Sequence, residues 1–489
     1  MDQAAIPVAP GGEGLLGHNA AMRNDRLGVL GKLARAEGPL LRLRVPPPLR
    51  AVVANEPDVV QELLVEKAGS ITKSDMLRFA LWNLAGEGLF TSTGDLWKRQ
   101  RRLMAPLFTP KALEAYARDM VACTLRTIEG WGDDRTLSLA HETTRLTMGI
   151  AAKTLFEADT FSEADEIGDA LTVALDWTGY VMARPSALLH VAAKRACEQV
   201  RTRTSGALSS LAARGEQAFT GPVVLWGPRG RALAGSIAFL DAHVQRMIDD
   251  RRRTLGTGRT DLLSRLIEAH DEGGTMDDRQ VRDEVLTLFV AGHETTATGL
   301  AWTLYLAARD PAVYAAMERE ADSIDDPPTV ADLPRLEVIG RAFREALRLY
   351  PPVYMFGRDT LEPMTLAGYT LRPRTNVMVS PYGLHHDPKL WPDPERFDPD
   401  RFLPEREAGR HRYAWLPFGA GPRVCIGNHF AMMEAALALA TLLRRYRFEP
   451  AGDDVPEPSA TLRPKHGVPM RVVRRPSARR AATLADLEP

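Results

Sequence analysis

The stretch that decides the fold runs from residue 418 to residue 427 and reads Phe418-Gly419-Ala420-Gly421-Pro422-Arg423-Val424-Cys425-Ile426-Gly427. Two glycines ahead of the cysteine permit a tight loop that approaches another group closely. An apolar pattern of helical period follows, so the sulfur is expected beside helix N-terminal N–H groups that favour a thiolate. Gly427 leaves room for a flat group, and Arg423 could pair with an acid on it. The pattern predicts a thiolate ligand for a planar iron cofactor.

The spacing of this stretch is more informative than its cysteine, because a lone buried cysteine is common. Phe-x-x-Gly-x-Arg-x-Cys-x-Gly fixes five positions, and a chance match is on the order of one in ten thousand. The segment is similar to the haem-binding loop of the cytochrome P450 family. That resemblance implies haem b as cofactor, Cys425 as the axial ligand of the haem iron, and cofactor contacts at Phe418, Gly419, Arg423 and Gly427.

A second motif, Ala291-Gly292-His293-Glu294-Thr295-Thr296, lies in the middle of a long stretch of helical period. Glycine and threonine are poor choices for the centre of a buried helix, so the hydrogen-bond ladder is expected to be weak there. The Thr295 hydroxyl is expected to bond back to the carbonyl of Ala291, and Glu294 can relay protons. The motif resembles the family's acid–alcohol pair, which implies catalytic roles for Glu294 and Thr295 and a cofactor contact at Ala291. A polar helix face with a surface glutamate is the alternative.

Two charged motifs fit the same family and stand in the family's order. Glu345 and Arg348 place opposite charges three residues apart on one helix face, which by itself is a common solvated pair. The resemblance implies that they join Arg401 in a buried charge network with a structural role.

Aromatic and basic residues elsewhere are implied as partners of the haem propionates. Trp97 and Arg101 lie about one helical turn apart, and an arginine guanidinium suits a carboxylate. Arg358, shortly after the Pro351-Pro352 pair, resembles another propionate partner. For Arg99 and Arg102, plain solvation is preferred over contact with the cofactor.

Composition excludes several classes of protein. The 489 residues carry 62 Lys+Arg against 63 Asp+Glu, a net charge of −1, and 45% of them are hydrophobic. Such a chain is too apolar for disorder and lacks the basic excess of a nucleic-acid binder. Three cysteines argue against a disulfide scaffold and suit a reducing cytoplasm. The N-terminus is not that of a signal peptide, and apolar runs fall short of the roughly 18–20 residues of a membrane span. A cytoplasmic protein without a membrane span is expected.

Helical period covers most of the chain, and a few alternating apolar stretches add strands. The chain is predicted to be mainly α with a small β component, in one P450-type domain over residues 1–473. Residues 1–30 are expected to form an irregular arm, residues 186–233 an extended lid region, and residues 474–489 a flexible basic tail. The expected elements are helices at 110–131, 141–156, 234–252, 278–308 and 338–350, a strand pair within 41–53, and strands near 364–371 and 377–380.

The resemblance implies a monooxygenase that inserts one oxygen atom of O2 into an apolar small molecule by hydroxylation or epoxidation. Neither a dinucleotide fingerprint nor an iron–sulfur cysteine cluster occurs in the sequence. We therefore expect electrons from a separate ferredoxin- or flavodoxin-like donor with its reductase, docked near Arg423 with Lys98, Arg99 and Arg102 as candidate contacts. The alternatives are a haem-thiolate isomerase, dehydratase or peroxide-dependent oxygenase, and a non-enzymatic haem sensor.

Substrate-pocket candidates follow from their position in the family's order of motifs. Part of this set precedes the Trp97 helix, and part follows the double proline. Each residue could equally belong to the core. The candidates are Phe79, Leu81, Trp82, Leu89, Val353, Tyr354 and Phe356.

Overall fold

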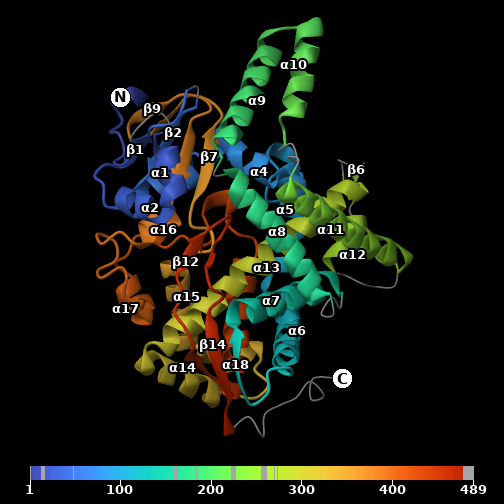
Figure 1. Cartoon of the computed structure of the whole chain (residues 1–489), viewed down its shortest axis with the longest axis vertical. Helices are drawn as coiled ribbons and strands as arrows, with labels where there is room; N and C mark the ends of the chain where they lie inside the picture. Colours follow the sequence, from blue (N-terminus) through green and yellow to red (C-terminus); the bar gives the residue numbers. More distant parts are fainter. Residues whose placement is uncertain are drawn as a thin grey trace.

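The computed structural model describes residues 2–12, 17–47, 49–158, 163–182, 184–221, 227–254, 261–268, 270–271 and 274–476. Helices form most of the molecule, and a small sheet lies beside the N-terminal segment (Figure 1). The predicted class, mainly α with a small β component, is therefore confirmed. In this part of the chain no helix combines the length and the apolar character that a bilayer crossing requires.

The long helix α13 (Asp278–Ala308) runs through the middle of the molecule (Figure 1). Asp277 caps its N-terminus, because the Asp277 carboxylate accepts a hydrogen bond from Gln280 N at 2.8 Å. Residues on all sides of the helix are buried, as expected for a helix surrounded by the core. The predicted bounds of this helix, 278–308, are those observed.

Several of the other helices contact α13 directly, and the rest pack on other elements. The remaining predicted helices are among them, and their observed bounds differ from the predictions by a few residues at one end or both. They are α3 (Pro57–Gln61), α4 (Asp75–Ala85), α5 (Gly94–Met104), α6 (Pro110–Ile128), α7 (Leu139–Phe156), α8 (Ala164–Met182), α11 (Pro228–Arg253), α12 (Leu262–Glu268), α14 (Pro311–Ser323), α15 (Glu337–Leu349), α16 (Pro381–His385), α17 (Pro404–Glu407) and α18 (Asn428–Arg445).

A five-stranded sheet has the strand order β1-β2-β10-β7-β3. Its edge strand β3 runs antiparallel to β7, and the register places Lys73 opposite Arg358 and Thr72 opposite Asp359. The predicted strand pair is present as β1 and β2. The strands are β1 (Leu40–Leu43), β2 (Ala51–Ala54), β3 (Ile71–Lys73), β7 (Phe356–Thr360) and β10 (Asn376–Val379).

Smaller strand groups lie outside this sheet. Strands β11, β14 and β4 form a three-stranded sheet, and the others pair in twos: β8 with β9, β12 with β13, and β5 with β6. Their bounds are β4 (Asp134–Ser138), β5 (His270–Asp271), β6 (Gly274–Thr275), β8 (Met364–Leu366), β9 (Tyr369–Leu371), β11 (Tyr446–Pro450), β12 (Pro456–Pro458), β13 (Leu462–Pro464) and β14 (Pro469–Arg474).

The N-terminal segment differs from the prediction of an irregular arm over residues 1–30. It contains α1 (His18–Asn24) and the start of α2 (Arg26–Ala34). The Asp25 carboxylate caps α2 by accepting from Gly28 N at 2.9 Å, and Ile6 and Ala9 are buried. The frequent glycines and prolines hid these short helices, because a helix of two turns shows too little apolar periodicity to be recognised.

Two helices follow α8 within the segment predicted to be an extended lid region. They are α9 (Pro185–Arg203) and α10 (Gly206–Ala218), and together they form a hairpin that stands out from the body of the molecule (Figure 1). The segment is therefore helical where it is described, its role as an extended lid stays a prediction, and residues 222–226 lie outside the described residues.

The predicted flexible tail begins too early. Arg474 is the last residue of β14, where it pairs with Tyr446, and the Arg475 guanidinium donates to the Asp322 carboxylate at 2.7 and 3.0 Å. Residues 477–489 of the predicted tail lie outside the described residues.

Candidate functional site

The loop that carries Cys425 lies between the helical turn Glu62–Glu66, which follows α3, and the start of α18. Gly421 has φ +68°, and a Cβ at this residue would come within 1.9 Å of the carbonyl oxygen of Leu64. Only glycine therefore allows this close approach. The amide of Cys425 donates to the carbonyl of Phe418 at 2.9 Å and closes the loop.

The Cys425 thiol lies deep in the protein and is nevertheless accessible to solvent. A side chain with both properties lines an internal cavity. Burial raises the pKa of the thiol, while the Gly427 N–H and the positive charges of Arg101 and Lys73 oppose that rise. If a ligand binds the deprotonated sulfur, these three groups are already placed to stabilise the thiolate.

Helix α13 contributes a second accessible position in the interior. Ala291 is exposed although it lies at the middle of a helix that is buried on all sides, and Thr295, one turn later, is half-buried. The Thr295 hydroxyl donates to the carbonyl oxygen of Ala291 at 2.6 Å, as the sequence predicted.

Four buried or half-buried cations gather beside Cys425, and we call Lys73, Arg101, Arg358 and Arg423 the cation cluster. Lys73 and Arg358 face each other across strands β3 and β7. The other two reach in from α5 and from the Cys425 loop.

The three arginines of the cation cluster donate to carbonyl oxygens, and Lys73 Nζ lies 4.5 Å from the centre of the Phe90 ring. Arg101 donates to Val424 O at 2.9 Å, and Arg423 donates to Ser92 O at 2.8 Å. Arg358 donates to the carbonyl of its neighbour Gly357 at 2.9 Å. No ion pair joins any of the four to Asp or Glu within the described ranges.

Burial and mutual repulsion show in the pKa values of these groups. Burial lowers the pKa of Arg358 to about 10. Burial, with Arg358, Arg78 and Arg101, lowers the pKa of Arg423 to about 9. Burial, followed by the charges of Arg358 and Arg423, holds the pKa of Lys73 well below its usual range. A cluster of uncompensated positive charge is costly without an anion. A ligand with two carboxylates, such as haem, fits this donor set.

Lys73 is the member of the cluster that sequence reasoning missed. Its neighbours carry no motif, and only the β3–β7 register brings it opposite Arg358. Trp97 was predicted to contact a propionate, and its ring lies 4.1 Å from the guanidinium carbon of Arg423. The face of the Trp97 ring therefore stabilises the Arg423 guanidinium and, through it, the site.

Glu294 points away from Thr295. Its carboxylate accepts a hydrogen bond from the Thr461 hydroxyl at 2.7 Å, and its residue is only 9% exposed. Burial raises the pKa of Glu294, against the opposing effects of Thr461 and Arg463. Arg463 in turn pairs with Asp176 at 2.8 Å, and the Asp176 side chain is half-exposed. These contacts link a buried acid to the protein surface.

The Glu345 network is buried and consists of one acid and two arginines. Arg348 donates to both carboxylate oxygens of Glu345, from Nε at 2.7 Å and from Nη2 at 2.8 Å. Arg401 lies 3.3 Å from the same carboxylate. Arg348 also donates to the carbonyl of His385 at 2.8 Å. The structure thus brings together the three residues that the sequence grouped.

The substrate-pocket candidates occupy two different places. Phe79, Leu81 and Leu89 are buried near α13, and the amide of Leu89 donates to the Glu284 carboxylate at 2.9 Å. Trp82 is half-buried. Val353 and Phe356 are half-buried at the start of β7.

The expectation that Tyr354 lines the pocket is corrected. Its ring packs in a separate core cluster with residues of α2 and the first strands. Its hydroxyl donates to Ser459 O at 2.7 Å and accepts from Arg26 at 2.6 Å. Because each of these bonds would be lost if the ring turned, Tyr354 is a structural residue of the N-terminal cluster.

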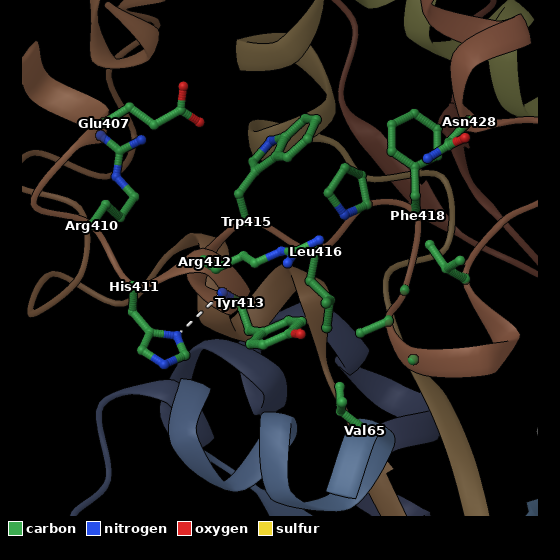
Figure 2. Close-up of a pocket in the computed structure, with 15 residues that line it drawn as sticks. Val65, Glu407, Arg410, His411, Arg412, Tyr413, Trp415, Leu416, Phe418 and Asn428 are labelled. Carbon is green, nitrogen blue, oxygen red and sulfur yellow. Dashed lines mark hydrogen bonds between the residues drawn. The ribbon is translucent and has the colours of Figure 1, made fainter. Parts of the chain in front are cut away.

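A surface hollow of about 560 Å³ lies against the Cys425 loop. Figure 2 shows Arg410, His411, Arg412 and Trp415 on one side of it and Phe418 on another. Its wall includes neither Cys425 nor a residue of α13. This hollow is therefore distinct from the interior space at Cys425.

Comparison with known proteins agrees with this geometry. The family described as "Cytochrome P450" matches residues 13–471 of the chain. The chain belongs to the cytochrome P450 family. This P450 is a haem-iron enzyme and a haem-thiolate monooxygenase, as the sequence predicted.

The single cytochrome P450-type fold is confirmed by comparison with a solved structure described as "Crystal structure of cytochrome P450DA heme domain". The two match with a TM-score of 0.76 at 28% identity, and the match covers 96% of this chain and 98% of that one.

Several bacterial relatives are similar over nearly their whole length. "Cyclooctatin synthase" of Streptomyces melanosporofaciens is 36% identical over 464 residues, covering 94% of this chain and 92% of the relative. "Cyclooctat-9-en-7-ol 5-monooxygenase" of the same organism is 36% identical, covering 91% and 89%. "Pentalenene oxygenase" of Streptomyces avermitilis is 32% identical, covering 93% and 94%.

Proposed function

We propose that this P450 holds haem b with Cys425 as the axial ligand and uses O2 to oxidise an apolar, terpenoid-like small molecule. The observation that carries the proposal is an accessible cysteine thiol deep in the protein, next to four cations that have no carboxylate partner among the described residues. A thiolate and a set of carboxylate-binding cations are the two things that the iron and the edge of a haem require.

In this proposal each residue of the site has a separate task. Lys73, Arg101, Arg358 and Arg423 hold the haem carboxylates. The c-type thioether attachment of haem is excluded, because the sequence contains no Cys-x-x-Cys-His segment. The remaining contacts with the cofactor come from Trp97, Ala291, Phe418, Gly419 and Gly427.

Proton supply is assigned to Glu294 and Thr295. The bound haem supplies the redox chemistry that activates dioxygen. The Thr295 hydroxyl is fixed at the accessible middle of α13 by its bond to Ala291. Burial raises the pKa of Glu294, which favours the protonated acid that a proton donor needs. Its carboxyl receives protons from the surface through the Thr461 hydroxyl and turns toward Thr295 to release them.

The substrate class follows from the relatives and from the pocket wall. Two similar enzymes are named for cyclooctat-9-en-7-ol and pentalenene. The buried candidates Phe79, Leu81 and Leu89 give an apolar wall next to α13. A cyclic terpene hydrocarbon or alcohol, hydroxylated or epoxidised by this enzyme, fits both.

Electrons are assigned to a separate ferredoxin- or flavodoxin-like protein with its own reductase. Lys98 and Arg102 are exposed on α5, and Arg412 is exposed beside the hollow next to the Cys425 loop. An acidic donor would be attracted to these cations. Reversing the charge at Arg99 and Arg102 should slow reduction by such a donor, whereas Arg203→Glu on the distant helix α9 should not. Equal reduction rates in all three proteins would contradict this dock.

We place the enzyme in the cytoplasm, because its 489 residues contain only three cysteines, Cys123, Cys197 and Cys425. A sparse and odd number of cysteines argues against a disulfide scaffold and is typical of a reducing compartment.

The first test is the spectrum of the reduced protein with and without carbon monoxide. Wild-type protein should give a strongly red-shifted Soret band, and Cys425→Ser should lose it because a serine hydroxyl cannot replace the thiolate. Cys197→Ser, which removes another thiol far along the chain, is the matched control and should keep the band. An imidazole-type spectrum in the wild type, or a retained band in Cys425→Ser, would contradict the assignment.

The second test follows the oxygen atom. Cyclic terpene hydrocarbons and alcohols are incubated with the enzyme, an electron donor and isotopically labelled O2. The product should carry one labelled oxygen atom. Turnover without O2 would instead favour an isomerase or dehydratase.

A further inference from the structure

The hairpin of α9 and α10 stands out from the molecule, yet its base is tied to the core by ion pairs of Lys194, Arg195 and Glu198 (Figure 1). Arg195 lies in the middle of α9, and its side chain is only 12% exposed. By contrast, the outer part of the hairpin presents Leu208 and Leu211 to solvent. The contacts of Arg195 therefore help to fix the position of the base of the hairpin.

Arg195 uses three nitrogen atoms on three partners. Nε donates to Asp75 at 2.9 Å, Nη2 donates to Asp359 at 2.7 Å, and Nη1 donates to the carbonyl oxygen of Arg374 at 3.0 Å. Asp75 is the first residue of α4 and Asp359 belongs to β7. One guanidinium thus joins α9 to the pocket helix α4 and to the five-stranded sheet.

The two acids depend on this arginine. The Asp359 side chain is fully buried, and that of Asp75 is 7% exposed. Asp359 also accepts from the amide of Asp75 at 2.9 Å and from the Asn376 side chain at 2.7 Å. Burial would raise the pKa of Asp75, but Arg195, Lys194 and Arg374 hold it below its ordinary value.

The same acids border the cation cluster. Asp75 follows Lys73 by two residues, and Asp359 follows Arg358 directly. Strands β3 and β7 pair Lys73 with Arg358. A change in the position of Asp75 or Asp359 would therefore be passed along two short strands to the cations.

A second contact joins α9 to the pocket helix. The rings of Phe79 on α4 and His190 on α9 lie 5.1 Å apart, and the His190 ring also meets Phe219, after α10, at 5.3 Å. This aromatic contact lies one and a half turns of α9 from Arg195. It can persist only while the base of α9 is held against α4.

We propose that Arg195 is a positioning residue: by bridging Asp75 and Asp359 it holds α9 against the pocket helix α4 and keeps β3 and β7 in the arrangement that aligns Lys73 with Arg358. The part that concerns haem rests on the function proposed above. The part that concerns the position of α9 does not. Loss of the bridge releases the base of the hairpin, widens the approach to the pocket and loosens the hold on the cofactor.

Hydrogen exchange on the haem-loaded enzyme tests the bridge itself. In Arg195→Gln the amides of residues 187–195 and of α4 should exchange about tenfold faster or more, because two buried carboxylates lose their counter-charge. The matched control is Arg201→Gln on the same helix, which removes a pair with Glu216 inside the hairpin. Its effect should remain within the hairpin and leave α4 unchanged. Equal exchange at α4 in both variants, or wild-type exchange in Arg195→Gln, would overturn the proposal.

Two further variants keep the result decisive if Arg195→Gln folds poorly. Asp75→Asn leaves Arg195 balanced by Asp359 and should speed exchange in α4 and α9 while β7 stays protected. Arg195→Lys keeps the charge but donates from a single nitrogen, so it should restore only part of the protection. Full protection in Asp75→Asn, or full rescue in Arg195→Lys, would contradict a bridge of fixed geometry.

Ligand entry separates positioning from mere stability. The association rate of the bulky azole clotrimazole with the haem iron should rise severalfold in Arg195→Gln, and that of the small ligand imidazole should not change. A structural defect alone would alter both rates or neither, and that outcome would count against the proposal. If wild-type protein lacks the thiolate spectrum, the proposed function fails, and the exchange data still decide the bridge.

Discussion

Two groups of buried arginines in this P450 have opposite surroundings. In the Glu345 network, Arg348 is matched by both oxygens of a fully buried carboxylate. In the cation cluster, Arg358 and Arg423 reach only carbonyl oxygens. Charge that is paired within the chain belongs to the fold, because a buried pair is complete without a ligand. Charge that is left uncompensated marks the place where an anion has to bind.

The largest expected effect tests the paired group. Glu345→Gln leaves Arg348 and Arg401 without a counter-charge, so the free energy of unfolding should fall by about 3–5 kcal/mol. Guanidinium denaturation of the haem-loaded enzyme measures this loss. The control is Glu407→Gln, which removes the half-exposed partner of Arg344 and should cost no more than about 1 kcal/mol. Similar losses in the two variants would show that the Glu345 pair is not a special support of the fold.

A second prediction concerns Glu434 on α18, a buried acid that has no cation partner among the described residues. Burial raises its pKa to about 8, against a hydrogen bond from Thr296. Between its ordinary pKa and about pH 8, the Glu434 carboxyl is therefore protonated in the folded protein and ionised in the unfolded chain. Stability should fall as the pH rises from about 5 to 8, by on the order of 2–3 kcal/mol.

Thermal unfolding across this pH range measures the Glu434 effect. Glu434→Gln should reduce the decline without removing it, because the neutral amide does not titrate whereas Glu284, whose pKa burial also raises to about 8, still does. Glu449→Gln, at a half-exposed residue of β11, should leave the decline unchanged. An unchanged slope in Glu434→Gln would mean that the Glu434 carboxyl is ionised in the folded protein.

The third prediction tests the uncompensated group. Arg358→Gln should speed haem loss about tenfold, because a charge-assisted hydrogen bond to a carboxylate is removed. In haem-depleted protein the same change should leave the free energy of unfolding unchanged or raise it by up to about 2 kcal/mol, since a buried unpaired charge disappears. Transfer of haem to an acceptor globin gives the first quantity, and denaturation gives the second. Destabilisation without faster haem loss would move Arg358 into the structural group.

The contrast also explains what the sequence could predict. Motifs with fixed spacing predicted the positions of Cys425 and Thr295, because each motif lies within one loop or one helix. The Glu345 network was predictable because its two segments follow the family's order of motifs. The bond from Thr295 to Ala291 was predictable for the same reason, since both atoms belong to one helical turn.

Contacts between distant segments were not predictable. Lys73 joins the cation cluster only through a strand register, and Arg195 reaches Asp359 across 164 residues. Tyr354 was assigned by its place after the double proline, whereas its direction is set by Arg26 and Ser459. Alternation and periodicity report which face of an element is apolar, but they do not report which other element that face meets.

The smallest expected effect concerns Glu294, which belongs neither to the paired nor to the uncompensated group. Its only hydrogen bond among the described side chains is the one from Thr461. That bond favours the ionised carboxylate and opposes the rise that burial causes, so Thr461→Val should raise the pKa of Glu294 further. An acid that must deliver protons remains protonated to higher pH when its pKa rises. The alkaline limb of product formation should therefore move to higher pH, while Thr461→Ser, which keeps a hydroxyl, should retain the wild-type profile. Identical profiles in all three proteins would mean that Glu294 does not supply the proton, and that its contact with Thr461 belongs to the fold.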